Sequence, residues 1–118
     1  MITNFETNKV LITKGLIHED VTGPLLGFIH RHKIEWGALP NTSSPLHIWA
    51  RDYMPVQVSK EKFVRFCYTP DYLQDSPEYK PDTSAILSEL GIHAIDSDII
   101  IDGGNIISCG DKVIMTEI

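Results

Sequence analysis

Residues 56–68 read Val-Gln-Val-Ser-Lys-Glu-Lys-Phe-Val-Arg-Phe-Cys-Tyr, and this stretch indicates two strands joined by a polar turn. The segments Val56–Ser59 and Lys62–Tyr68 are rich in β-branched and aromatic residues, which favour strands. The second segment is apolar on much of both faces, which is typical of a strand that is covered on two sides. We therefore expect a hairpin in the middle of the chain.

Helices and further strands are expected on both sides of this hairpin. Before it, the pattern predicts a strand at Lys9–Thr13, a helix at Pro24–Lys33 and a strand at Ile34–Ala38. After it, Asp82 is expected to cap a helix that ends before a glycine. Short strands are expected at four apolar runs, namely Ile92–Ile95, Ile99–Ile101, Asn105–Ser108 and Lys112–Ile118. This alternation predicts an α/β fold, in which a module of strand, helix and strands occurs twice.

Composition excludes several classes of protein. The chain has 118 residues, of which 42% are hydrophobic and 22% charged, as in an ordinary globular domain. A net charge of -6 argues against nucleic acid as a partner, and no apolar run is long enough to cross a membrane. The two cysteines, Cys67 and Cys109, lack the spacing of a metal site or a disulfide framework. We expect a cytoplasmic protein that binds no metal.

The first candidate functional motif is the stretch Ile-Trp-Ala-Arg-Asp-Tyr-Met-Pro at residues 48–55. Trp49 and Asp52 are three residues apart, so in an extended or turning segment both side chains would face one pocket. A carboxylate beside an aromatic face suits a planar cation such as guanidinium. The alternative is a surface turn containing Arg51 and Asp52, with Trp49 in the core. We expect Pro55 to prevent a long helix here.

The second candidate motif is Asp-Gly-Gly-Asn at residues 102–105, directly after an apolar run. A carboxylate at the end of a buried strand, followed by two glycines that are free to adopt positive φ, would project into a cleft. Asp102 would then be a second acceptor for a cation. The alternative is a tight turn between strands, in which Gly103, Gly104 and Asn105 serve only the backbone.

The other reactive side chains fit structural roles better. Cys67 lies between aromatic residues in a predicted strand, where burial would raise its pKa and make it inert. Cys109 is expected to be more exposed, without a histidine near it in the sequence. His47 would either line the cleft beside Trp49 or lie in an exposed loop. Three tyrosines around a proline-rich loop would either face a substrate or pack, namely Tyr68, Tyr72 and Tyr79.

The two motifs together, in this order and at this separation, resemble the guanidino-group modifying superfamily. The form Trp-x-Arg-Asp-x-x-Pro is most similar to agmatine deiminases and bacterial-type peptidylarginine deiminases. The resemblance implies a five-bladed α/β propeller (the pentein fold), of which residues 1–118 would form about two ββαβ-like modules. It also implies that Asp52 binds the substrate's guanidinium, that Trp49 shapes the pocket, and that the region of Arg51 and of residues 102–105 contacts the substrate.

The chemistry implied by the resemblance is covalent. A cysteine attacks the guanidinium carbon of agmatine, arginine or a peptidyl-arginine, and a histidine in a Gly-His-x-Asp motif moves the protons. No metal or organic cofactor takes part. No Gly-His-x-Asp motif occurs in the sequence, so we expect residues 1–118 to be the N-terminal part of a single catalytic domain and to be inactive alone. The expected partners are a small guanidino substrate and either a second copy of the chain or a missing C-terminal portion, which would supply the cysteine and the histidine.

Three alternatives remain open at this stage. The same fold also supports amidinotransferases, in which an amine rather than water resolves the covalent intermediate. A second class is a domain that binds small guanidino cations without turnover, which would need no cysteine. The third is a structural α/β domain in which both motifs are ordinary turns.

Overall fold

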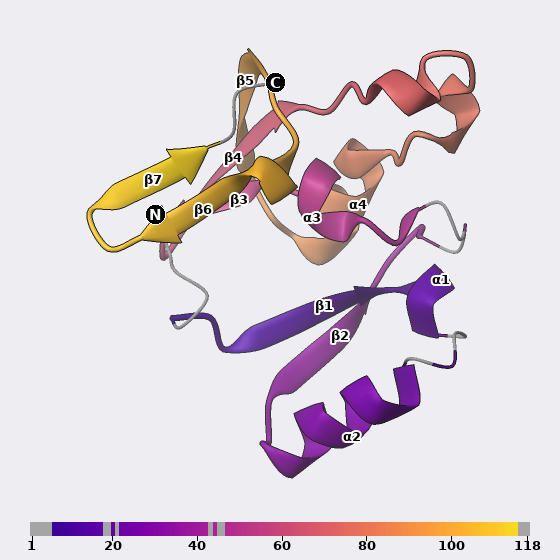
Figure 1. Cartoon of the computed structure of the whole chain (residues 1–118), viewed down its shortest axis with the longest axis vertical. Coiled ribbons are helices and arrows are strands. Elements are labelled where there is room, and N and C mark those ends of the chain that lie inside the picture. Colours follow the sequence, from indigo (N-terminus) through magenta and orange to yellow (C-terminus); the bar gives the residue numbers. More distant parts are fainter. Residues whose placement is uncertain (1–5, 18–19, 21, 43, 45–46, 116–118) are drawn as a thin grey trace.

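The computed structural model describes residues 6–17, 20, 22–42, 44 and 47–115, and these form a mixed α/β structure with three small sheets and no closed barrel (Figure 1). The predicted partial propeller stays a prediction. Two of the sheets have two strands each and the third has three. Short helical turns link the sheets, and the candidate motifs occupy two of these turns.

The N-terminal sheet pairs β1 (Lys9–Thr13) with β2 (Glu35–Leu39) in parallel. A parallel pair needs a crossover connection, and here α1 (Lys14–Ile17) and α2 (Thr22–Arg31) provide it. Both strands and the longer helix were predicted, although we expected no helix at Lys14–Ile17. Of the apolar residues of α2, Ile29 is buried while Leu25 is exposed. A sheet of two strands is too narrow to cover more of the helix.

The central sheet has the strand order β3-β4-β5. The antiparallel pair β3 (Val56–Ser59) and β4 (Lys62–Cys67) confirms the predicted hairpin. The helix α4 (Thr83–Leu90) then carries the chain to β5 (Ala94–Ile100), which runs parallel to β4. The caps of α4 are also as predicted, since the Asp82 carboxylate accepts a hydrogen bond from the Ala85 N–H and Gly91 adopts a φ of 66°.

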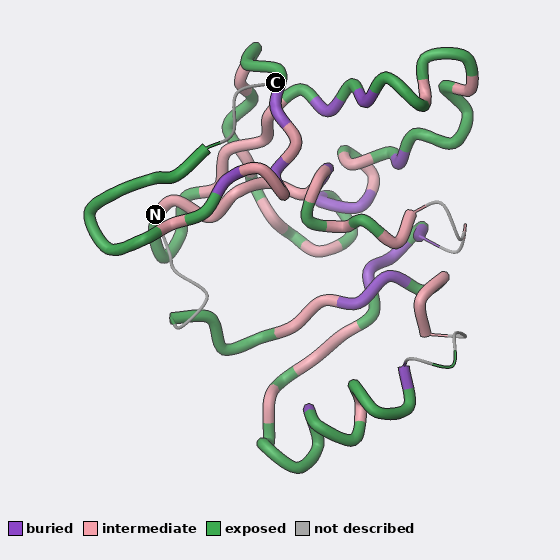
Figure 2. Tube along the Cα trace, viewed as in Figure 1, coloured by how far each residue is buried: buried purple, intermediate pink, exposed green. Residues whose placement is uncertain are grey.

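The strand β5 differs from the prediction in two ways. It is continuous where the sequence predicted two short strands, because β4 pairs with it from Ala94 to Ile100 with one shift in register. It is also not the buried strand that we expected before the second motif. Ile95, Ile99 and Ile100 are all more than half exposed, whereas Ile101, which follows β5, is buried. Figure 2 shows the trace coloured by how far each residue is buried. As the outer strand of its sheet, β5 has a neighbour on one edge alone.

The last sheet is a hairpin of β6 (Ile106–Cys109) and β7 (Lys112–Met115), turned at Gly110 with a φ of 61°. The predicted strand began one residue earlier, at Asn105, which instead belongs to the 3-10 turn η4 (Gly103–Asn105). The strand that we expected over Lys112–Ile118 is confirmed as far as Met115, and its last three residues lie outside the described part of the chain. Every residue of β7 is exposed.

The core lies where the first two sheets meet. Leu39 from β2, Tyr68 after β4 and Ile86 from α4 are buried together with Tyr53. Tyr53 belongs to α3 (Ala50–Tyr53), a single helical turn between β2 and β3. The core therefore anchors the turn that contains the first candidate motif.

Candidate functional site

The first motif forms a single helical turn, which the sequence did not predict. α3 begins after Trp49, whose carbonyl accepts a hydrogen bond from the Asp52 N–H at 3.0 Å. It ends at Met54, which is extended with a ψ of 151°, as expected for a residue that precedes a proline. Pro55 therefore limits the helix as predicted, but leaves room for one turn.

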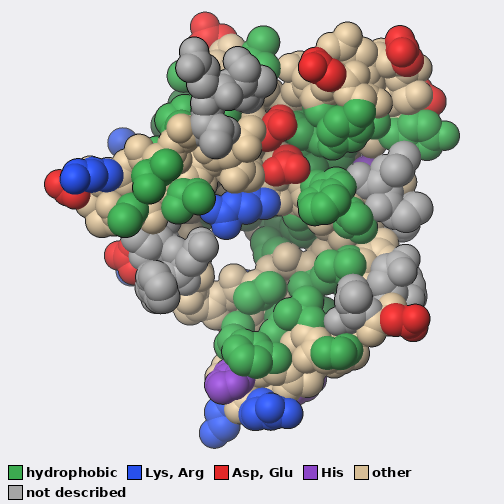
Figure 3. Space-filling view, viewed as in Figure 1, with side chains coloured by type: hydrophobic (Ala, Val, Ile, Leu, Met, Phe, Trp, Pro, Cys, Tyr) green, Lys and Arg blue, Asp and Glu red, His purple; other side chains and the backbone are tan. Residues whose placement is uncertain are grey.

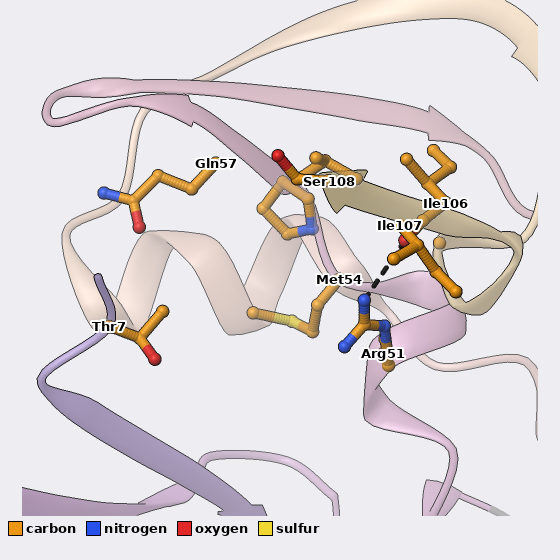
Figure 4. Close-up of a pocket in the computed structure, with 10 residues that line it drawn as sticks. Thr7, Arg51, Met54, Gln57, Ile106, Ile107 and Ser108 are labelled. Carbon is orange, nitrogen blue, oxygen red and sulfur yellow. Dashed lines mark hydrogen bonds between the residues drawn. The ribbon is translucent and has the colours of Figure 1, made fainter. Parts of the chain in front are cut away.

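The second motif forms η4 and lies against α3. The backbone N–H of Gly104 donates to Asp52 Oδ1 at 3.1 Å, and Arg51 Nη2 donates to the Ile106 carbonyl at 3.1 Å. Figure 4 shows the arginine side chain reaching from α3 to that carbonyl. Two segments about fifty residues apart in the sequence thus meet through two hydrogen bonds, and Asp52 and Asp102 come to one place.

The glycines of the second motif have a different role from the one that we predicted. Among the described residues, the glycines with positive φ are Gly91 and Gly110, so neither Gly103 nor Gly104 is there for a left-handed backbone. A Cβ at Gly103 would collide with the Arg51 carbonyl oxygen, and a Cβ at Gly104 would collide with the Asp52 carboxylate. The two glycines therefore allow close contact between the turns, a steric role that their proximity in space explains.

The site is acidic and partly shielded from water. Burial raises the pKa of the Asp102 carboxyl above its ordinary value, and the negative charges of Asp52 and Asp71 raise it further. Removing water from neighbouring carboxylates is unfavourable unless a cation joins them. On the molecular face that Figure 3 shows, acidic and basic side chains lie together near the centre, bordered by hydrophobic ones. A positive charge beside Asp102 would favour the ionised form of its carboxyl group.

A tyrosine pair borders the carboxylates. Tyr68 is buried after β4, and its hydroxyl lies 2.7 Å from that of Tyr72. Burial raises the pKa of Tyr68 most, followed by the hydrogen bond to Tyr72, and the charges of Asp52 and Asp102 add to the shift. Tyr68 is thus a buried side chain near both carboxylates. Of the three candidate tyrosines, Tyr79 contributes only its carbonyl, which lies 3.1 Å from His47 Nε2.

Trp49 is 61% exposed, which excludes the alternative that placed it in the core. It lies at the start of α3, one turn before Asp52. Asn105, the last residue of the second motif, closes η4 by donating its N–H to the Asp102 carbonyl at 2.9 Å. Its role in the structure is thus to shape the backbone that presents Asp102.

Both cysteines are exposed in the structure. Cys67 is exposed, contrary to the prediction, and Cys109 is exposed as expected. Cys67 is the last residue of β4, and the four residues before it are half-buried. The prediction for Cys67 was wrong because burial changes at this end of the strand, where Cys67 is exposed and the next residue, Tyr68, is buried.

His47 is half-buried and fixed in place. Besides the contact of its ring with Tyr79, its carbonyl accepts a hydrogen bond from the Tyr53 hydroxyl at 2.8 Å. These bonds tie the segment before α3 to the core, so His47 belongs to the support of the first motif and is not an exposed loop residue.

The sequence analysis did not identify Asp71 as part of the site. A single carboxylate in a proline-rich loop gives no local signal that it lies near Asp102.

A cavity of about 210 Å³ lies beside the two turns. Met54, Gly103 and Ile106 line it together with Arg51, whereas the carboxylates of Asp52 and Asp102 do not (Figure 4).

The described residues contain no group of three or more His, Cys, Asp or Glu side chains that could hold a metal ion. No helix in the described ranges is long and apolar enough to cross a membrane.

Searches for similar proteins found no matching family model, no matching curated protein and no matching solved structure. The function is therefore argued from the site itself.

Proposed function

We propose that this chain provides the guanidinium-binding half of an active site of the deiminase type. The observation that supports this proposal best is the meeting of Asp52 and Asp102, which come from two distant segments and lie close enough for Asp52 to raise the pKa of Asp102. Two ordinary surface turns would have no need to place two partly desolvated carboxylates together.

A guanidinium ion suits this arrangement because it is planar and has five N–H donors. Asp52 already accepts one hydrogen bond from Gly104, which leaves further acceptor positions on its carboxylate. Asp102 caps η4 without a side-chain hydrogen bond to the turn, so the turn does not occupy the acceptor positions of its carboxylate. The exposed indole of Trp49 would add a cation–π contact worth about 0.5–2 kcal/mol.

The reaction that such binding would serve is hydrolysis of a guanidino group through a covalent intermediate on a cysteine. The required histidine motif is not in this sequence. We therefore expect residues 1–118 to bind the cation without turning it over, with the nucleophile and base supplied by other residues of a complete enzyme. An amidinotransferase would use the same binding half, and Asp52 and Asp102 would serve both reactions equally.

The test is a calorimetric titration of the 118-residue chain with methylguanidinium, agmatine and arginine, with methylammonium as the comparison ligand. Asp52→Asn and Asp102→Asn are each expected to weaken guanidinium binding by about tenfold to a hundredfold, the range for losing a hydrogen bond to a charged group. Asp98→Asn is the matched control, because it removes the same charge from an exposed position of β5. Equal affinity of all four proteins, or no preference for guanidinium over ammonium, would rule the proposal out.

A further inference from the structure

Arg51 makes a contact that the resemblance to guanidino-modifying enzymes does not explain. Its Nη2 donates to the carbonyl of Ile106 at the start of β6, and its own carbonyl lies against Gly103. Both ends of the residue therefore contact the segment that contains the second motif (Figure 4).

The hydrogen bond that Arg51 donates goes to a backbone carbonyl and not to the carboxylate of the second motif. The groups that act on Asp102 are its surroundings, which raise its pKa by burial, and the carboxylates of Asp52 and Asp71. Arg51 is not among them, although it is adjacent to Asp52 in the sequence. The contact that links Arg51 to this segment is its bond to the Ile106 backbone.

Two attachments constrain the relative position of the turns more than one does. With the bond from Gly104 to Asp52 alone, η4 could pivot about a single hydrogen bond. The bond from Arg51 to Ile106 lies two residues further along the same segment and prevents that pivot. α3 and η4 are single turns with few backbone hydrogen bonds of their own. Such cross-links therefore add to the constraint that the buried side chains of Tyr53, Ile101 and Ile106 provide.

We infer that Arg51 is a positioning residue, which holds residues 102–106 against α3 and thereby fixes the separation of the Asp52 and Asp102 carboxylates. The identity of the ligand rests on the function proposed above, but the positioning itself does not. Arg51 is thus reassigned from contacting the substrate to maintaining the geometry of the two groups that would.

The experiment is a cycle of variants read by carbon-13 NMR of the Asp102 carboxyl group. In the parent chain, Asp52→Asn is expected to lower the pKa of Asp102, because it removes one of the charges that raise it. If Arg51 fixes the separation, Arg51→Met will reduce that effect by about half or more, since charge coupling falls with distance. Arg51→Lys retains a hydrogen-bond donor, so in that background Asp52→Asn is expected to regain part of its effect on the pKa of Asp102. Arg31→Met is the matched control, because it removes the same charge from the exposed end of α2.

An unchanged effect of Asp52→Asn in the Arg51→Met background would overturn the inference, even if that variant melts at a lower temperature. If Arg51→Met does not fold, the cycle is run with Arg51→Gln, whose shorter side chain is not expected to reach the Ile106 carbonyl. A parallel titration with methylguanidinium is expected to show affinity about tenfold weaker in the Arg51→Met chain. Should the parent chain bind no methylguanidinium, the proposed function fails, while the NMR cycle still decides the role of Arg51.

Discussion

The backbone N–H of Gly104 donates to Asp52 Oδ1 at 3.1 Å, and this bond brings the two candidate motifs together. The glycine leaves no room for a side chain, because a Cβ there would collide with the same carboxylate. The contact therefore links a sequence feature, the glycine pair, to the geometry of the carboxylates.

Gly104→Ala is expected to destabilise the fold by about 1–3 kcal/mol, the usual cost of overpacking, and to weaken any binding at the carboxylates. Urea denaturation measures the first effect and calorimetry the second. Gly27→Ala is the control, because a Cβ at Gly27 meets open space on α2. That variant is expected to gain about 0.5–1 kcal/mol, the helix preference of alanine over glycine. Equal stability of the two variants would contradict the close contact at Gly104.

Asp102→Asn is expected to stabilise the chain near neutral pH. The pKa of Asp102 is raised in the folded state, so its protonated form favours folding. That contribution is complete below the unfolded-state pKa of about 3.9 and is lost as the pH rises through the higher folded-state pKa. Asparagine carries no charge at any pH, and Asp102 makes no capping hydrogen bond that the variant would lose.

The midpoint of urea denaturation of the Asp102→Asn chain should therefore exceed that of the parent at about pH 7, and the difference should shrink as the pH approaches 3. Asp98→Asn, on the exposed strand β5, provides the comparison for a carboxylate outside the site. A variant that is less stable than the parent at neutral pH would mean that the Asp102 carboxylate is favourably solvated or paired.

Trp49→Ala is expected to affect binding but not folding. The side chain is 61% exposed, so its removal should change stability by less than about 0.5 kcal/mol. If the indole contacts a bound guanidinium, affinity should fall by about twofold to thirtyfold, which corresponds to 0.5–2 kcal/mol. Trp49→Phe retains an aromatic face and should recover much of the loss. Unchanged affinity in the alanine variant would place the indole outside the binding site.

A substitution of Ile86 tests whether the core supports α3. It is fully buried, and Ile86→Ala is expected to destabilise the chain by about 2–5 kcal/mol. Ile95→Ala, at a side chain that is 57% exposed, should cost less than about 0.5 kcal/mol. Thermal melts of both variants measure the contrast. Similar losses at the two positions would mean that the exposed face of β5 is covered in solution.

Local sequence signals predicted those elements whose cause is local. The hairpin of β3 and β4 follows from β-branched and aromatic runs around a polar turn, and α4 follows from Asp82 and Gly91 at its two ends. The prediction for Cys67 failed because it required knowledge of whether a neighbour covers that face of β4. The exposure of Ile99 and Ile100 has the same origin, since an apolar run shows that a strand can be buried, not that it is.

The candidate site was predictable only in part. Asp52 and Asp102 were chosen from their motifs, but their contact depends on tertiary structure that no local pattern encodes. Asp71 and the anchoring role of His47 were missed for the same reason. The helical turn at α3 was also missed, because four residues are too few to show helical periodicity.

The most direct test of guanidinium binding by Asp52 and Asp102 is a carbon-13 NMR titration of their carboxyl groups with methylguanidinium. If the two side chains bind the cation, both signals will shift along one binding curve. The pKa of Asp102 will also fall in the bound state, because a positive charge nearby opposes the effect of the neighbouring carboxylates. Signals that stay in place at saturating methylguanidinium, or that shift equally with methylammonium, would show that the two carboxylates form no guanidinium site.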